Sequence, residues 1–178
     1  SDQFCGECGA ALAVGAVPRA PGATAPTAQG PPAAASERRL VSVLFTDLVG
    51  FTTLSESKDP EEVRELLTTY FETAERLVTR YGGTIEKFIG DAVMAVWGTP
   101  VAQEDDAERA VRTALDLVDA VAELGEANGL PGLRARAGVL TGEAAVTIGA
   151  LGQGMVAGDL VNTASRIQSA ARPGEVFV

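Results

Sequence analysis

Two aspartates in this sequence stand where their carboxylates could face one pocket. Asp47 follows residues 40–45, a β-rich apolar run that predicts a buried strand, and Asp91 follows Gly90 in a tight turn between two further predicted strands. Mg²⁺ takes oxygen ligands and keeps substrate phosphates among them, so two such carboxylates could hold a pair of ions. The chain after Asp47 turns through Gly50 towards a helix, and this turn would offer backbone N–H groups to phosphates. An isolated aspartate at a strand end is more often a turn former or a helix cap.

A polar pair near the end of the sequence could complete such a site. Asn162 and Arg166 lie four residues apart in a predicted helix that Gly158 and Asp159 open, so they share one face of that helix. Apolar residues take the other positions, which leaves the pair free to point into a cleft. The simpler interpretation of the pair alone is a solvated helix face.

These residues fall in three segments that resemble the core motifs of class III adenylyl and guanylyl cyclases. The segments are Phe-x-Asp-x-x-Gly-Phe-Thr at 45–52, Glu-Lys-x-x-Gly-Asp at 86–91 and Val-Asn-x-Ala-Ser-Arg at 161–166. Their order and spacing agree with the family, and the similarity covers residues 37–178. The resemblance implies the class III cyclase fold, an α+β, ferredoxin-like α/β sandwich in which helices cover a mainly antiparallel sheet.

The resemblance implies roles for the residues of the first motif and of the turn. Asp47 and Asp91 would be the metal carboxylates, with the Leu48 carbonyl as a third ligand, for two Mg²⁺ or Mn²⁺ ions per site. The β- and γ-phosphates would be held by backbone groups and one hydroxyl from Val49, Gly50, Phe51 and Thr52.

The remaining motif residues would recognise the base and stabilise the transition state. Lys87 matches the family lysine that reads the purine edge and favours adenine. Asn162 would position the ribose, and Arg166 would stabilise charge on the α-phosphate. In the family, the metal half and the Asn/Arg half of each site come from different subunits. The resemblance therefore implies an adenylyl cyclase that converts ATP to 3′,5′-cyclic AMP and pyrophosphate at a homodimer interface.

One position departs from the adenine-specific pattern. Members of that kind place Asp or Thr seven residues before the asparagine, where this sequence has Met155. Methionine cannot supply a directed hydrogen bond to the exocyclic amino group. Two alternatives therefore stay open, a GTP-using cyclase and a weak or inactive cyclase-fold module that dimerises or senses nucleotides. Asp159 is nearby, but we predict that it is the N-cap of the last helix.

The two ends of the sequence carry separate expectations. Residues 1–12 resemble half of a zinc ribbon, and Cys5 and Cys8 would bind zinc only with a missing partner Cys pair, because zinc needs four ligands. Residues 13–36 are rich in Ala, Pro and Gly and predict a flexible linker.

The family also has a further lysine beyond the strand that begins at Glu175, whereas this sequence stops at Val178. We expect residues 37–178 to be a cyclase domain truncated at its C-terminus, with weak or no activity in this form.

The composition excludes several classes of function. The 178 residues include no histidine, which rules out Ser-His and Cys-His nucleophiles and histidine metal sites. A net charge of −10 without basic clusters argues against binding to nucleic acid or to an anionic membrane. Without a run of about 20 apolar residues or a signal segment, we expect a cytoplasmic protein.

The elements that must position these residues follow from periodicity and capping. Asp59 and Pro60 predict the start of an amphipathic helix that Gly82 and Gly83 end. The other predicted elements are strands at 84–89 and 92–97, a helix at 103–127, a strand pair at 133–140 and 144–148 around Thr141-Gly142-Glu143, a helix from Gly158-Asp159 to about Ala171, and a strand from Glu175.

Overall fold

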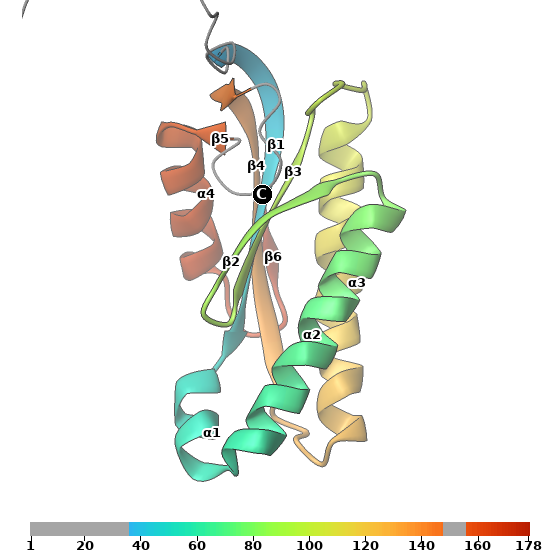
Figure 1. Cartoon of the computed structure of the whole chain (residues 1–178), viewed down its shortest axis with the longest axis vertical. Coiled ribbons are helices and arrows are strands. Elements are labelled where there is room, and N and C mark those ends of the chain that lie inside the picture. The colour runs from blue at the N-terminus through green and yellow to red at the C-terminus, as the bar shows by residue number, and fades with distance from the viewer. Residues whose placement is uncertain (1–35, 148–155) are drawn as a thin grey trace, which may run out of the picture. The chain divides into compact units, whose positions relative to one another are not determined.

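The computed structural model describes residues 36–147 and 156–178 (Figure 1). The predicted half zinc ribbon with Cys5 and Cys8, nearly all of the predicted linker, and Met155 lie outside the described residues. Among the described residues, no helix combines the length and the apolar character that crossing a membrane requires.

Among the described residues, one six-stranded sheet forms the centre of the domain. Its strand order is β2-β3-β1-β4-β5, with β6 paired to β4. All pairs are antiparallel except β4 with β6. This sheet confirms the prediction of a mainly antiparallel α+β fold. The strands are β1 (Ser36–Val49), β2 (Thr84–Ile89), β3 (Ala92–Trp97), β4 (Arg134–Thr147), β5 (Val156–Ala157) and β6 (Val176–Phe177).

Helices cover both faces of the sheet. Figure 1 shows α2 (Pro60–Arg80) and α3 (Asp106–Ala127) on one side and α4 (Asp159–Ala170) on the other, while α1 (Phe51–Ser57) follows the end of β1. Side chains alternate along β1 between these two faces. Leu44 and Leu48 therefore join the core with α2 and α3, whereas Val43 and Phe45 join the core with α4. By the same alternation, Asp47 belongs to the α4 face.

The long helix α2 begins and ends where its sequence predicts. The Asp59 carboxylate accepts a hydrogen bond from the Glu61 N–H at 2.8 Å, and Pro60 is the first helical residue. Gly82 follows the helix with a φ of 71°, a conformation that glycine adopts without strain. Helix α3 starts at Asp106, later than predicted, because the Asp106 carboxylate accepts the N–H of Gln103 at 2.7 Å and closes a turn before the helix.

The predicted strand pair around Thr141-Gly142-Glu143 is wrong. Residues 134–147 form the single strand β4, which pairs with β1 without interruption and places Gly142 opposite Val41. A Cβ at Gly142 would lie 2.9 Å from Leu160 Cδ1. Glycine therefore stands here because α4 packs closely on the strand, and not because the chain turns.

The predicted N-cap of α4 is also wrong by one residue. Gly158 occupies the cap position with a φ of 133°, and Asp159 is the first residue of the helix. Few L-residues adopt that backbone conformation, so glycine takes the cap and Asp159 makes no capping hydrogen bond.

Candidate active site

Asp47 lies near the end of β1 on the face that α4 covers. Its carboxylate oxygen Oδ2 accepts a hydrogen bond from Arg136 Nη2 at 3.1 Å and a longer one from Gln168 Nε2 at 3.4 Å. Arg136 is the residue directly opposite Asp47 in β4, and Gln168 belongs to α4. The Asp47 side chain is thus about three-quarters buried and surrounded by donors.

The structure brings Asp91 into contact with Asp47. Thr46 pairs with Val93, so the β2–β3 turn that carries Asp91 lies beside the end of β1. Burial, and after it the hydrogen bond and the negative charge of Asp47, raise the pKa of the Asp91 carboxyl from 3.8 to about 6, against the lowering effect of backbone hydrogen bonds that include Leu48. Two carboxyls held this close favour either a shared proton or a bound cation.

This pair fits the metal site that the sequence predicts. Both carboxyls and the backbone of Leu48 meet at one point, where burial and then the neighbouring Asp47 carboxyl raise the pKa of Asp91. No group of three or more Cys, Asp or Glu side chains that could hold a metal forms among the described residues. A metal ion at this point would therefore need further oxygen ligands from substrate or water, as Mg²⁺ sites commonly have.

A β-bulge places Lys87 on the same face of the sheet as Asp47. The register of β2 against β3 shifts between Ile85, which pairs with Ala95, and Lys87, which pairs with Met94. Ala95 belongs to the core with α2 and α3, and Met94 to the core with α4. Residues two apart in a regular strand share a face, so the extra residue moves Lys87 from the helix pair to the Asp47 side.

The predicted phosphate-binding turn adjoins Asp47. Gly50 has a φ of 74° and precedes α1, whose first turn has no side-chain cap. Val49 and Phe51 are half-buried, and Thr52 is exposed. The chain reverses here through a conformation that favours glycine, which leaves backbone N–H groups at the start of α1 open to a ligand.

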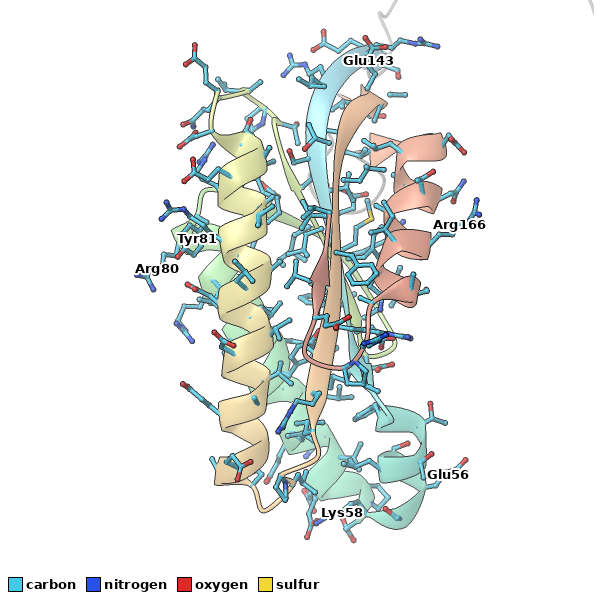
Figure 2. The ribbon with its side chains drawn as sticks, turned by 180° about the vertical axis from the view of Figure 1, so that it is seen from behind. Glu56, Lys58, Arg80, Tyr81, Glu143 and Arg166 are labelled. Atoms are coloured by element: carbon cyan, nitrogen blue, oxygen red, sulfur yellow. The ribbon has the colours of Figure 1, made fainter. Side chains whose placement is uncertain are left out.

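Asn162 and Arg166 do not join the other predicted residues within one chain. Both are exposed on α4, and Figure 2 shows Arg166 pointing outward from the helix, away from the sheet. The buried side of α4 is formed instead by Leu160, Ala164 and Gln168. The structure therefore gathers Asp47, Asp91 and the Leu48 backbone at one point and directs Arg166 elsewhere.

Sequence reasoning missed Arg136 and Gln168. Neither belongs to the segments that carry the family resemblance, and their contact with Asp47 depends on the β1–β4 register and on the packing of α4. The only local signal is the alternation Arg134-Ala135-Arg136-Ala137, which indicates a charged side chain on every second position of a strand.

Known proteins show the same fold and sequence pattern. The chain is 35% identical to the guanylyl cyclase Cya2, with a TM-score of 0.72 over 80% of this chain and 76% of that one. It is 34% identical to the adenylyl cyclase CyaB from P. aeruginosa, with a TM-score of 0.74 over 80% and 78%.

Among curated sequences, it is 42% identical over 140 residues to adenylate cyclase 1 of Rhizobium meliloti (strain 1021), covering 75% of this chain and 21% of the relative. The guanylate cyclase soluble subunit beta-2 of Rattus norvegicus is 33% identical over 155 residues, which cover 84% of this chain and 22% of that protein. The chain thus spans about a fifth of the length of these relatives.

A model of the adenylate and guanylate cyclase catalytic domain matches residues 34–178, which include every described residue. With the fold, the relatives and the paired carboxylates in agreement, this chain belongs to the class III adenylyl and guanylyl cyclase catalytic domain family.

Proposed function

We propose that this domain is an adenylyl cyclase that converts ATP to 3′,5′-cyclic AMP and pyrophosphate at the interface of a homodimer. The observation that carries the proposal is the contact between the Asp47 and Asp91 carboxyls, on the side of the sheet to which the bulge in β2 directs Lys87. The ion pair with Arg136 balances one of the two carboxylate charges, and a bound cation would balance the other at neutral pH.

Asp47, Asp91 and the Leu48 carbonyl would hold two Mg²⁺ or Mn²⁺ ions. When bound, such ions lower the pKa of the ribose 3′-hydroxyl and polarise the α-phosphate and the leaving pyrophosphate. The chain itself would bind the β- and γ-phosphates with backbone N–H groups of Val49, Gly50 and Phe51 and with the hydroxyl of Thr52. These groups would fix the triphosphate beside the carboxylate pair. The ribose 3′-hydroxyl, the α-phosphate and the leaving pyrophosphate would then lie in line.

A second copy of the chain would supply the other half of each site. Asn162 and Arg166 are exposed and Arg166 points away from its own sheet, so one chain offers them to a partner and not to its own Asp47. Arg166 of the second copy would donate to the α-phosphate oxygens as charge accumulates there, and Asn162 would hold the ribose. We also propose a cytoplasmic location, where ATP is available.

ATP is the preferred substrate in this proposal because Lys87 lies on the Asp47 face of the sheet, where it could recognise the edge of an adenine base. Relatives named as adenylate cyclases support this choice. GTP is the second candidate, since Met155 replaces the residue expected to pair with the adenine amino group and other relatives are named as guanylyl cyclases.

The test is product formation from ATP and from GTP with Mn²⁺, by the unmutated full-length protein and by its Asp91→Ala variant. Cyclic AMP that disappears in Asp91→Ala is the expected result. Cyclic GMP alone would reverse the substrate assignment. No product from either nucleotide over a wide range of protein concentration would favour the alternative of an inactive cyclase-fold module that dimerises or senses nucleotides.

The homodimer has its own test, in which two inactive variants are mixed. Asp47→Ala and Arg166→Ala each destroy both sites of their own homodimers, but a mixed dimer contains one intact site and one doubly damaged site. Random exchange should therefore restore about a quarter of the unmutated activity. If mixed dimers are demonstrated and the activity stays absent, the two halves do not come from different chains.

A further inference from the structure

Arg136 and Gln168 tie the carboxylate of Asp47 to helix α4. Arg136 donates through Nη2 to Asp47 Oδ2 at 3.1 Å and through Nη1 to the carbonyl of Ser169, in the last turn of α4, at 3.2 Å. Gln168 donates from the same helix to the same Asp47 oxygen at 3.4 Å. The end of α4 is thus fastened to Asp47 by two side chains.

The backbone is built to permit this connection. The β1–β4 register sets Arg136 directly opposite Asp47. A Cβ at Gly138 would lie 2.4 Å from the backbone N of Gln168, so only glycine allows α4 to approach β4 this closely. Gln168 is 6% exposed, which keeps its amide directed inward rather than into solvent.

The guanidinium of Arg136 supplies positive charge to Asp47 where a metal ion would otherwise supply it. It forms an ion pair with Asp47, whose carboxyl also contacts Asp91. The Nε of Arg136 is buried and has no hydrogen-bond partner among the described residues, so this position does not satisfy the whole side chain. A divalent cation bound by Asp47 would repel the guanidinium and weaken its hold on the carboxylate.

Helix α4 also carries Arg166, two residues before Gln168, on its exposed side. In the proposed homodimer, which this inference presupposes, Asp47 belongs to one site and Arg166 of the same chain belongs to the other. We propose that Arg136 and Gln168 are positioning residues that hold Asp47 against α4 in the metal-free chain. Metal binding at Asp47 competes with this hold, releases the end of α4, and so couples the metal occupancy of one site to the helix that serves the other.

The first measurement is Mn²⁺ affinity by electron paramagnetic resonance on the whole protein, without nucleotide. Removal of the competing charge in Arg136→Gln should tighten Mn²⁺ binding about tenfold, the value of one charged hydrogen bond. Gln168→Met keeps the side-chain volume and removes only an amide donor, so it should tighten binding about threefold. Arg134→Gln is the matched control, because Arg134 lies in the same strand and donates to the Leu133 carbonyl rather than to Asp47; its affinity should equal that of the unmutated protein.

The second measurement is amide hydrogen exchange in the last turns of α4. Mn²⁺ should speed exchange there in the unmutated protein and have a smaller effect in Arg136→Gln, where only the Gln168 contact with Asp47 remains to be broken. Unchanged or weaker Mn²⁺ binding by both Arg136→Gln and Gln168→Met would overturn the competition. Exchange that ignores Mn²⁺ in an unmutated protein that binds the ion would overturn the coupling. If the unmutated protein binds no Mn²⁺, the metal site of the proposed function fails, and the inference fails with it.

Discussion

Replacing Asp91 by asparagine should stabilise the metal-free protein at neutral pH while it abolishes metal binding. Burial and the neighbouring Asp47 raise the pKa of the Asp91 carboxyl from 3.8 to about 6. Because the pKa in the folded state is the higher one, the folded state binds the proton more tightly than the unfolded state. The contribution of Asp91 to the free energy of unfolding is therefore greatest below pH 3.8 and is lost as the pH rises towards 6.

The magnitude follows from that difference in pKa. The full difference corresponds to about 3 kcal/mol, and solvent screening of a half-buried carboxyl reduces this to about 1 kcal/mol. Asparagine keeps the shape and cannot ionise, so it should remove this penalty. The free energy of unfolding of Asp91→Asn, relative to the unmutated protein, should rise by about 1 kcal/mol between pH 4 and pH 7.

Urea unfolding in EDTA at both pH values measures this difference. Asp119→Asn, a substitution at an exposed position of α3, is the control and should follow the unmutated protein at both pH values. Added Mn²⁺ should stabilise the unmutated protein but not Asp91→Asn. If Asp91→Asn shows the same pH dependence as the unmutated protein, Asp91 and Asp47 do not crowd each other in the folded state, and the main argument for a cation site is refuted.

Three further substitutions test the packing and the base contact. Gly138→Ala should cost about 3 kcal/mol in urea unfolding, because its Cβ would lie 2.4 Å from the backbone of Gln168; Gly132→Ala, with no atom within 4 Å, should cost far less. Trp97→Phe should cost about 2 kcal/mol, because it removes the indole hydrogen bond to the Tyr81 carbonyl, 3.0 Å long; an unchanged unfolding midpoint would contradict this. Lys87→Ala should lower kcat/KM for ATP about tenfold or more, and equal losses for ATP and GTP would show that Lys87 does not select the base.

The fold was predictable where local chemistry determines it. Asp59 and Pro60 define the start of α2, and two β-rich runs joined by the Gly90 turn define β2 and β3 with their observed bounds. The prediction failed at Gly142, where a glycine between polar residues has the sequence pattern of a turn. Its actual reason is the approach of Leu160 from α4, a contact between distant parts of the chain that periodicity does not report.

The residues of the candidate site also divide into those that local sequence features predict and those that depend on contacts between distant parts of the chain. Asp47 and Asp91 could be proposed as metal ligands because a strand end and a tight turn are local features and both residues lie in the segments that carry the family resemblance. The face on which Lys87 lies could not, since it depends on a bulge that only the pairing with β3 reveals. Arg136 and Gln168 could not be predicted as partners of Asp47. Their contacts with its carboxylate depend on the β1–β4 register and on the packing of α4, which the local sequence does not report.

The packing of helix α4 gives a physical reason for the proposed division of each site between two copies of the chain. The helix buries Leu160, Ala164 and Gln168, which recur every four positions. The last of them, Gln168, donates a hydrogen bond to Asp47 and so connects the helix to its own sheet. Asn162 and Arg166 repeat at the same spacing but stand about half a turn away, so the rotation that buries the first set necessarily exposes the second. Turning Arg166 towards its own Asp47 would expose Leu160 and Ala164 and break the Gln168 contact. The packing that stabilises the monomer therefore keeps Arg166 away from Asp47 of the same chain, which supports the proposal that a second copy supplies Arg166.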